Sequence, residues 1–240
     1  MDERERVLAA VRSALRSEPK IGAGAAAIEM NFDEGVLTLA GVVASIAMKK
    51  LALERAAELP PVRGIVDRLH VRPAAHMGDG EIAQHVRDAL LQEPALADCA
   101  IAVRRGGRVG TVRDPAPRAG SIEIEVDDGI VTLNGEVSGL GRKRLAGVLA
   151  WWVPGSRDVI NGIAVAPDEE DSADAMEEAV RIVLEKDPFV DASQIRVGVR
   201  RGVVRLTGTV PTESERDMAE FDAWYVFGVD DVENAIVVRA

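Results

Sequence analysis

The chain of 240 residues carries 29 Lys and Arg against 40 Asp and Glu, which gives a formal net charge of −11. This acidic balance argues against a general nucleic-acid binder, and an aromatic content of 3% disfavours base-stacking surfaces. A single Cys excludes an intrachain disulfide framework and a cysteine-cluster metal site, and three His leave little room for a histidine-built metal centre. The apolar fraction of 47% is ample for packed cores. These numbers favour a binding or scaffolding protein over an enzyme.

The first residues of the chain are charged and lead straight into an amphipathic segment. They contain no unbroken apolar region and no small-residue cleavage site, so they do not resemble a secretory signal. No stretch approaches the roughly 18 to 20 apolar residues that span a bilayer. We therefore expect a cytoplasmic protein without a transmembrane segment, and the lone Cys is compatible with a reducing compartment.

Three segments of the chain show a pattern typical of an amphipathic helix. In the first, Val7, Val11 and Leu15 recur at helical spacing, and the acid–proline pair Glu18-Pro19 follows. Proline ends a helix because its ring clashes with the preceding turn and it lacks an N–H. The same pattern precedes Pro94 and Pro188. We expect a helix before each of these three prolines.

Glycines then recur in pairs six residues apart. The pairs are Gly35 and Gly41, Gly129 and Gly135, and Gly202 and Gly208. Twenty residues after the second glycine of each pair comes Pro61, Gly155 or Gly228, each followed by alternating apolar residues. Chance agreement of so many offsets is improbable. The sequence therefore predicts three tandem copies of one unit.

Two alternating runs around an x-Gly turn make a strong hairpin signal in each copy. With Glu34-Gly35 as the turn, Phe32 faces Leu37 and Met30 faces Leu39. The same counting gives the pairs Val126–Val131, Ile124–Leu133, Val199–Val204 and Val197–Leu206 in the other two copies. One face of every hairpin is then wholly apolar, which supports the register, because a one-residue slip would turn each of these side chains to the other face.

A second helix is expected after each glycine pair, and in the third copy a capping box from Thr212 to Glu215 opens it. A third strand closes the unit, so the predicted order is helix, strand, strand, helix, strand. Two helices on one face of a three-stranded sheet make an α+β fold. We expect the copies at residues 1–73, 79–167 and 173–240, and the acidic linker 167–172 is typical of a solvated tether.

The hairpin pattern x-G-x-V-x-L-x-G and the ending G-x-x-x-V-x-N-x-I-x-V resemble the BON domain, the transport-associated domain of bacterial osmotically inducible and nodulation proteins. The ending is complete around Asn161 and Asn234, whereas the first copy has Pro61 for the glycine and Asp67 for the asparagine. The resemblance implies non-enzymatic roles: phospholipid binding at the cell envelope, osmotic-stress protection, chaperone-like contacts and, in some cytoplasmic members, potassium binding.

The second copy contains an insertion at about residues 102–120, because its proline and hairpin glycine lie 35 residues apart, against 16 and 14 in the other copies. This insertion contains five arginines and a single acid, Asp114. The arginines are Arg104, Arg105, Arg108, Arg113 and Arg118. Gly106-Gly107 is suited to turn a short hairpin there. Two interpretations stay open. One is an anion-binding arm, because the Arg fork matches phosphate geometry; the other is a solvated loop, or one docked on the acidic third copy.

The aromatic residues and a basic run give further candidates. Trp151 and Trp224 share one repeat position, and Trp152 and Tyr225 share the next. Adjacent helical residues point about 100° apart, so we expect the first two in the cores and the second two between copies; the alternative is an aromatic edge at a membrane interface. The run 142–144 either contacts anionic lipid or is a solvated helix face.

The chain has no Walker, G-x-S-x-G or H-E-x-x-H sequence, so we expect no catalytic residue, no metal site and no cofactor. The predicted function is a stress-related adaptor that binds anionic phospholipid or an acidic protein surface through the second copy. Its candidate residues are Arg104, Arg105, Arg108, Arg113, Arg118, Arg142, Lys143, Arg144 and Trp152. The alternative is a potassium sensor or a protein-interaction scaffold. Units of about 65 residues lie near the lower limit of independent stability, which makes a homo-oligomer possible.

Overall fold

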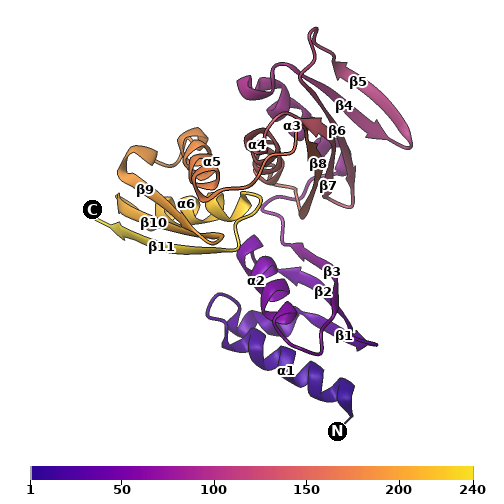
Figure 1. The fold of residues 1–240 in the computed structure, drawn as a ribbon, viewed down its shortest axis with the longest axis vertical. Helices are drawn as coiled ribbons and strands as arrows, with labels where there is room; N and C mark the ends of the chain where they lie inside the picture. The colour runs from indigo at the N-terminus through magenta and orange to yellow at the C-terminus, as the bar shows by residue number, and fades with distance from the viewer. Residues whose placement is uncertain (1, 240) are drawn as a thin grey trace. The chain divides into compact units, whose positions relative to one another are not determined.

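The computed structural model describes residues 2–239. It consists of two compact units, Met1–Arg72 and Pro73–Ala240. The first unit holds one copy of the predicted fold, called repeat 1 below, and the second holds repeats 2 and 3 (Figure 1). The predicted α+β class is confirmed in all three, and the order helix, strand, strand, helix, strand is confirmed in repeats 1 and 3, whereas repeat 2 has two further strands after its first helix.

Repeat 1 shows the fold in its simplest form. Its elements are α1 (Glu3–Ser17), β1 (Glu29–Asp33), β2 (Val36–Val43), α2 (Ile46–Ala57) and β3 (Gly64–Val71). The sheet has the order β1-β2-β3, in which β2 pairs antiparallel with β1 and parallel with β3. Val7, Val11 and Leu15, the stripe predicted for the first helix, are all buried. A short 3₁₀ helix at Gly22–Ala27, which the sequence patterns do not indicate, leads into β1.

Repeats 2 and 3 follow the same plan within the second unit. Repeat 2 contains α3 (Asp79–Gln92), β4 (Cys99–Arg105), β5 (Arg108–Arg113), β6 (Gly120–Asp127), β7 (Ile130–Val137), α4 (Leu140–Trp151) and β8 (Asp158–Val165). Repeat 3 contains α5 (Ala173–Lys186), β9 (Ile195–Arg200), β10 (Val203–Val210), α6 (Glu213–Tyr225) and β11 (Asp231–Val238). The sheet of repeat 3 has the order β11-β10-β9, whereas that of repeat 2 has five strands in the order β5-β4-β6-β7-β8.

The predicted hairpin register is confirmed at every pair named above. Each turn has both central residues at positive φ, for example 45° at Glu34 and 86° at Gly35. This is the type I′ geometry, whose twist matches that of the flanking strands. The turn and the apolar face therefore specify one pairing together.

The second glycine of each pair has a different task. Gly41, Gly135 and Gly208 have φ values of 130°, 131° and 143°, and a Cβ on them would lie 2.4, 2.0 and 2.0 Å from a backbone carbonyl oxygen. These oxygens belong to residues at or just before the start of the antiparallel partner strand: Ala27, Ser121 and Gln194. The chain passes so close to the central strand that only hydrogen fits. The repeat glycines are thus a packing requirement of the fold.

The asparagine of the closing motif ties the last strand to the second helix. Asn161 Nδ2 donates to the carbonyl oxygen of Lys143 at 2.8 Å, and Asn234 Nδ2 donates to that of Arg216 at 3.0 Å. In repeat 1 the corresponding residue is Asp67, whose carboxylate lies 3.0 Å from Nζ of the buried Lys49. An ion pair thus replaces the amide contact where the sequence departs from the motif.

The acidic linker between repeats 2 and 3 is bonded to α4. Glu169 Oε2 accepts a hydrogen bond from the backbone N–H of Leu140, the first residue of α4, at 2.7 Å, and Asp171 pairs with Arg144. A carboxylate at a helix N-terminus satisfies a backbone donor that has no partner within the helix. The linker is exposed to solvent at both residues, as predicted, but these two side chains attach it to α4, so it is not a free tether there.

Candidate functional site

The insertion of repeat 2 forms a hairpin that joins the sheet and adds two strands to the predicted three. β4 pairs parallel with β6 and antiparallel with β5, and Gly106 and Gly107 turn the hairpin at φ values of 52° and 76°. A helix about 10 Å wide covers about two strands spaced about 4.8 Å apart, so α3 and α4 cannot cover five. The outer strand β5 is exposed along nearly its whole length.

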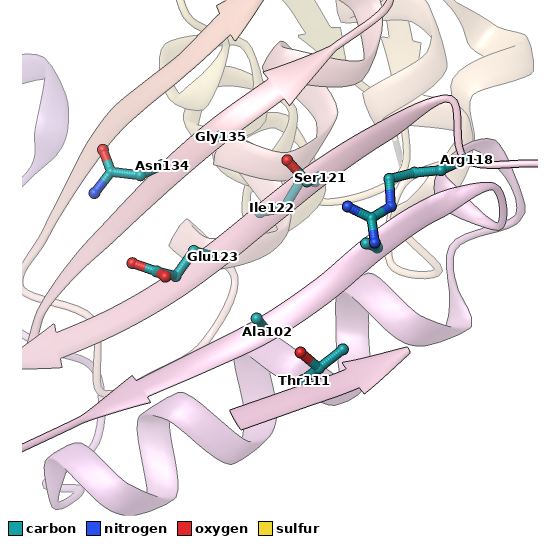
Figure 2. A pocket seen from close by; sticks show the side chains of 9 residues that line it. Ala102, Thr111, Arg118, Ser121, Ile122, Glu123, Asn134 and Gly135 are labelled. Carbon is teal, nitrogen blue, oxygen red and sulfur yellow. The ribbon is translucent and has the colours of Figure 1, made fainter. Parts of the chain in front are cut away.

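One hollow lies on the sheet face that carries no helices (Figure 2). It has a volume of about 300 Å³, and a row of paired residues crosses it from Thr111 through Ala102 and Glu123 to Asn134. The hollow exists because Ala100 and Ala102 are small. Arg118 stands at its rim (Figure 2). Hydroxyl, amide and guanidinium groups together suit a small polar ligand.

A second hollow lies on the opposite face, between α3 and the hairpin. Arginines from three elements line it: Arg87 of α3, Arg105 of β4 and Arg108 of β5. Apolar side chains, among them Val103 and Val112, lie between them. Val112 is 46% exposed and Val109, on the same edge strand, is 48% exposed. The hairpin thus presents basic and apolar side chains together at the edge of the sheet.

Four of the five insertion arginines bond within repeat 2, and three of these lie away from the hairpin turn. Arg104 forms a bidentate pair with Glu123 at 2.7 and 3.1 Å, and Arg118 pairs with Asp114. Arg113 donates to the carbonyl oxygens of Cys99, Leu91 and Leu96 and so fastens β5 to the loop after α3. These contacts fix the hairpin in place.

Arg105 and Arg108 are the two insertion arginines nearest the hairpin turn, and both are exposed. Arg105 donates to the carbonyl oxygen of Gly80 at 3.0 Å. Within residues 2–239, the hydrogen-bond partners of Arg104, Arg105, Arg113 and Arg118 all belong to repeat 2. The structure therefore shows an ordered hairpin in place of a loop, and its arginines do not dock on repeat 3.

The basic run of α4 divides between two surroundings. Arg142 pairs with Asp98 at 2.8 and 3.0 Å, and this guanidinium holds the pKa of the Asp98 carboxyl below its usual range. Lys143 lies 4.6 Å from the ring centre of Phe227 in repeat 3. Arg144 is 1% exposed and donates to the carbonyl oxygen of Phe227 at 3.0 Å. Lys143 and Arg144 therefore lie at the contact with repeat 3, apart from the hairpin arginines.

The predicted positions of the aromatic residues hold for three of four. Trp224 is completely buried, Tyr225 stacks on Trp151 with ring centres 5.5 Å apart, and Trp152 Nε1 donates to Asp222 Oδ1 at 2.8 Å. The prediction of Trp151 as a core residue is wrong, because its ring packs between the repeats. Both neighbouring aromatic residues of repeat 2 thus contact α6.

Sequence reasoning missed two groups of residues. The first is the pair of exposed valines on β5, whose exposure follows from the sheet gaining more strands than its helices cover. The second is the set of acids at the contact between repeats 2 and 3, among them Asp187, Asp222 and Glu93, all of which are buried. Glu93 and Asp187 are the acids of the acid–proline pairs, but that pattern marks the end of a helix and not a contact, and no motif marks Asp222.

Residues 2–239 lack two kinds of feature. No three His, Cys, Asp or Glu side chains are grouped so that they could hold a metal ion. No described helix combines the length and the apolar character that crossing a bilayer requires.

Comparisons with known proteins extend these observations. The family model of the BON domain matches residues 4–73, 111–167 and 172–240. Osmotically-inducible protein Y of Escherichia coli (strain K12) is 29% identical over 124 residues, which are 49% of this chain and 62% of that protein. The C-terminal domain of CdsD, a structural protein of the Type III secretion system of Chlamydia trachomatis, is 15% identical with a TM-score of 0.26, each chain being covered in full. The match to repeat 2 begins at residue 111, within β5, and so leaves out β4, the first of the two added strands.

Proposed function

Since the chain belongs to the BON-domain family, we propose that it is a non-enzymatic binding protein that attaches to anionic phospholipid surfaces through the β4–β5 hairpin of repeat 2. The observation that carries this proposal is the composition of the hairpin edge. Arg105 and Arg108 flank the turn, and Val109 and Val112 on β5 are about half exposed. Basic residues attract a negatively charged surface, and neighbouring apolar side chains gain by entering the headgroup region.

The surroundings of the hairpin support the same function. Arg104, Arg113 and Arg118 bond within repeat 2 and hold the two strands in place, so little conformational freedom is lost on binding. The chain as a whole carries −11, which repels an anionic membrane. Binding therefore depends on the local charge of the hairpin, and we expect it to weaken as salt screens that charge.

The double variant Arg105→Gln/Arg108→Gln is expected to bind vesicles of phosphatidylglycerol and phosphatidylcholine about 30-fold more weakly than the natural chain. Each basic residue near an anionic surface contributes about 1 kcal/mol, and two such losses correspond to this factor. Sedimentation of the full chain with these vesicles at low salt measures the change. Pure phosphatidylcholine vesicles should retain neither protein.

The matched control is Arg196→Gln/Arg200→Gln, which removes the same charge from exposed positions on β9, the edge strand of repeat 3. We expect this variant to bind like the natural chain. Equal weakening by both pairs of substitutions would show that net charge, and not the position of the hairpin arginines, determines vesicle binding. Absence of vesicle binding by the natural chain at low salt would refute the function itself.

A further inference from the structure

Repeats 2 and 3 meet where α4 packs against α5 and α6 (Figure 1). Two ion pairs cross or border this contact. Arg144 Nη2 of α4 lies 2.5 Å from Asp171 Oδ2 of the linker, and Lys186 Nζ of α5 lies 2.9 Å from Glu93 Oε2 after α3. Each pair joins a cation to a partly or fully buried acid, so the charges in this part of the contact are balanced.

The end of α4 meets a different arrangement. Asp222 of α6 is 3% exposed, and its Oδ1 accepts the Trp152 indole hydrogen bond at 2.8 Å. Its other oxygen, Oδ2, is buried and accepts no hydrogen bond from any described residue. A second carboxyl, that of Asp187, which follows α5 and is 8% exposed, interacts with Asp222. Two buried acids therefore face each other without a cation between them.

No other charged group facing Asp222 neutralises this pair. From α4, Arg144 is directed to Phe227 and Asp171, and the end of that helix presents the uncharged Trp152. From α5, Lys186 is engaged with Glu93. From α6 itself, Tyr225 is the titratable neighbour, and burial together with the charge of Asp222 raises the pKa of its hydroxyl to about 12. A proton is the remaining species that can relieve the two acids.

We propose that Asp187 and Asp222 share a proton that locks repeat 3 onto the end of α4, so that acid tightens the contact between repeats 2 and 3 and base weakens it. With the proton on Asp222 Oδ2, that oxygen donates to the carboxylate of Asp187, and Oδ1 keeps the hydrogen bond from Trp152. Both buried oxygens of Asp222 are then satisfied. Without the proton, a negative charge faces another negative charge in a dry contact.

The electrostatics of the site agree with this geometry. Burial raises the pKa of Asp222 from 3.8 to about 8, the Trp152 hydrogen bond opposes the rise, and the Asp187 carboxylate adds to it. When the repeats separate, α4 no longer covers Asp222 and its pKa falls, while Asp187, which belongs to the same repeat, stays beside it. The closed form therefore holds one more proton below a pH of about 8, down to the pKa of Asp222 in the open form. Over that window the closed-to-open ratio falls up to tenfold for each unit of rising pH, and it is constant outside the window.

The Trp152 indole N–H reports directly on this proton. The full chain has three Trp, so ¹⁵N spectra contain three indole signals, and Trp152→Phe identifies the relevant one. We expect this signal to titrate with a midpoint near pH 8 in the natural chain and to be constant in Asp222→Asn, whose amide keeps the hydrogen bonds but has no proton to lose. Asp187→Asn should move the midpoint to lower pH, because it removes the neighbouring negative charge.

Melting temperatures of the full chain between pH 5 and pH 9 test the lock. The natural chain should lose stability relative to Asp222→Asn as pH rises to 8, whereas Asp217→Asn, an exposed acid of the same helix, should keep the natural pH dependence. Titration of the indole signal in Asp222→Asn, or its absence in the natural chain, would overturn the shared proton. A normal titration with no pH-dependent difference in melting temperature would overturn the lock. If Asp222→Asn does not fold, the midpoint shift in Asp187→Asn decides between these outcomes.

Discussion

Gly208→Ala is expected to lower the free energy of unfolding of repeat 3 by about 3 kcal/mol, the upper range for a single strained backbone position. A Cβ at this residue would lie 2.0 Å from the carbonyl oxygen of Gln194, and the φ of 143° is itself unfavourable for an L residue. The contacting atom belongs to the backbone, so relief requires the chain before β9 to move away from β10. That movement breaks the pairing at the end of the hairpin.

Urea unfolding followed by Trp fluorescence measures this change, because all three Trp lie in the second unit. The matched control is Gly198→Ala on β9 of the same sheet, where a Cβ would meet no atom within 4 Å and φ is not in the left-handed region. We expect the control to change stability by less than about 1 kcal/mol. Equal effects of the two substitutions would show that the close approach is not what requires glycine at the repeat position.

Arg144→Ala is expected to lower the free energy of unfolding of the second unit by about 3 kcal/mol. The side chain is almost fully buried, and it both pairs with Asp171 and donates to the carbonyl oxygen of Phe227. Its removal takes this donor from the carbonyl of Phe227 and opens space in the contact between repeats. Asp171 is 41% exposed and returns to water, which places the effect at the low end of the range for broken buried pairs.

Arg181→Ala provides the comparison for this prediction. Arg181 of α5 contacts two acids, Glu178 and Glu185, but all three side chains are about half exposed. Exposed helix pairs contribute about 0.3–0.5 kcal/mol each. Arg181→Ala therefore removes more ion pairs than Arg144→Ala but should lower the free energy of unfolding much less. The same urea unfolding measures both variants. A loss at Arg144 as small as that at Arg181 would show that the buried contact does not stabilise the second unit.

The hairpins illustrate how much of this fold can be predicted from sequence. Both signals that specify their register are local: alternating apolar residues mark one face, and the x-Gly turn fixes which residues are opposite. The same locality explains why the hairpin within the insertion could be anticipated from Gly106-Gly107. The pairing of this hairpin with β6 could not be anticipated, because β4 and β6 are parallel and are joined through β5 and a loop.

The candidate site was predictable in part for a related reason. Composition identified the arginines of the insertion, but a run of charge does not reveal which guanidinium groups bond within the domain. Arg113 ends against three carbonyl oxygens, whereas Arg105 and Arg108 stand beside the turn. Among the acids at the contact between repeats, Glu93 and Asp187 were marked only as helix ends before prolines, and Asp222 had no signal. Asp222 lies on a helix with exposed acids such as Asp217, and the approach of Trp152 is what distinguishes it.

The parallel ladder between β4 and β6 has a consequence for a chain built from three similar domains. In repeats 1 and 3 the first hairpin strand, β1 or β9, is an open sheet edge that another strand can join. In repeat 2 the equivalent strand, β6, is enclosed between β4 and β7. Neighbouring copies of one fold are prone to exchange equivalent elements during folding. Because β4 occupies the place beside β6 that a foreign strand would take, the β6–β7 hairpin of the middle domain is protected against such mispairing at that edge.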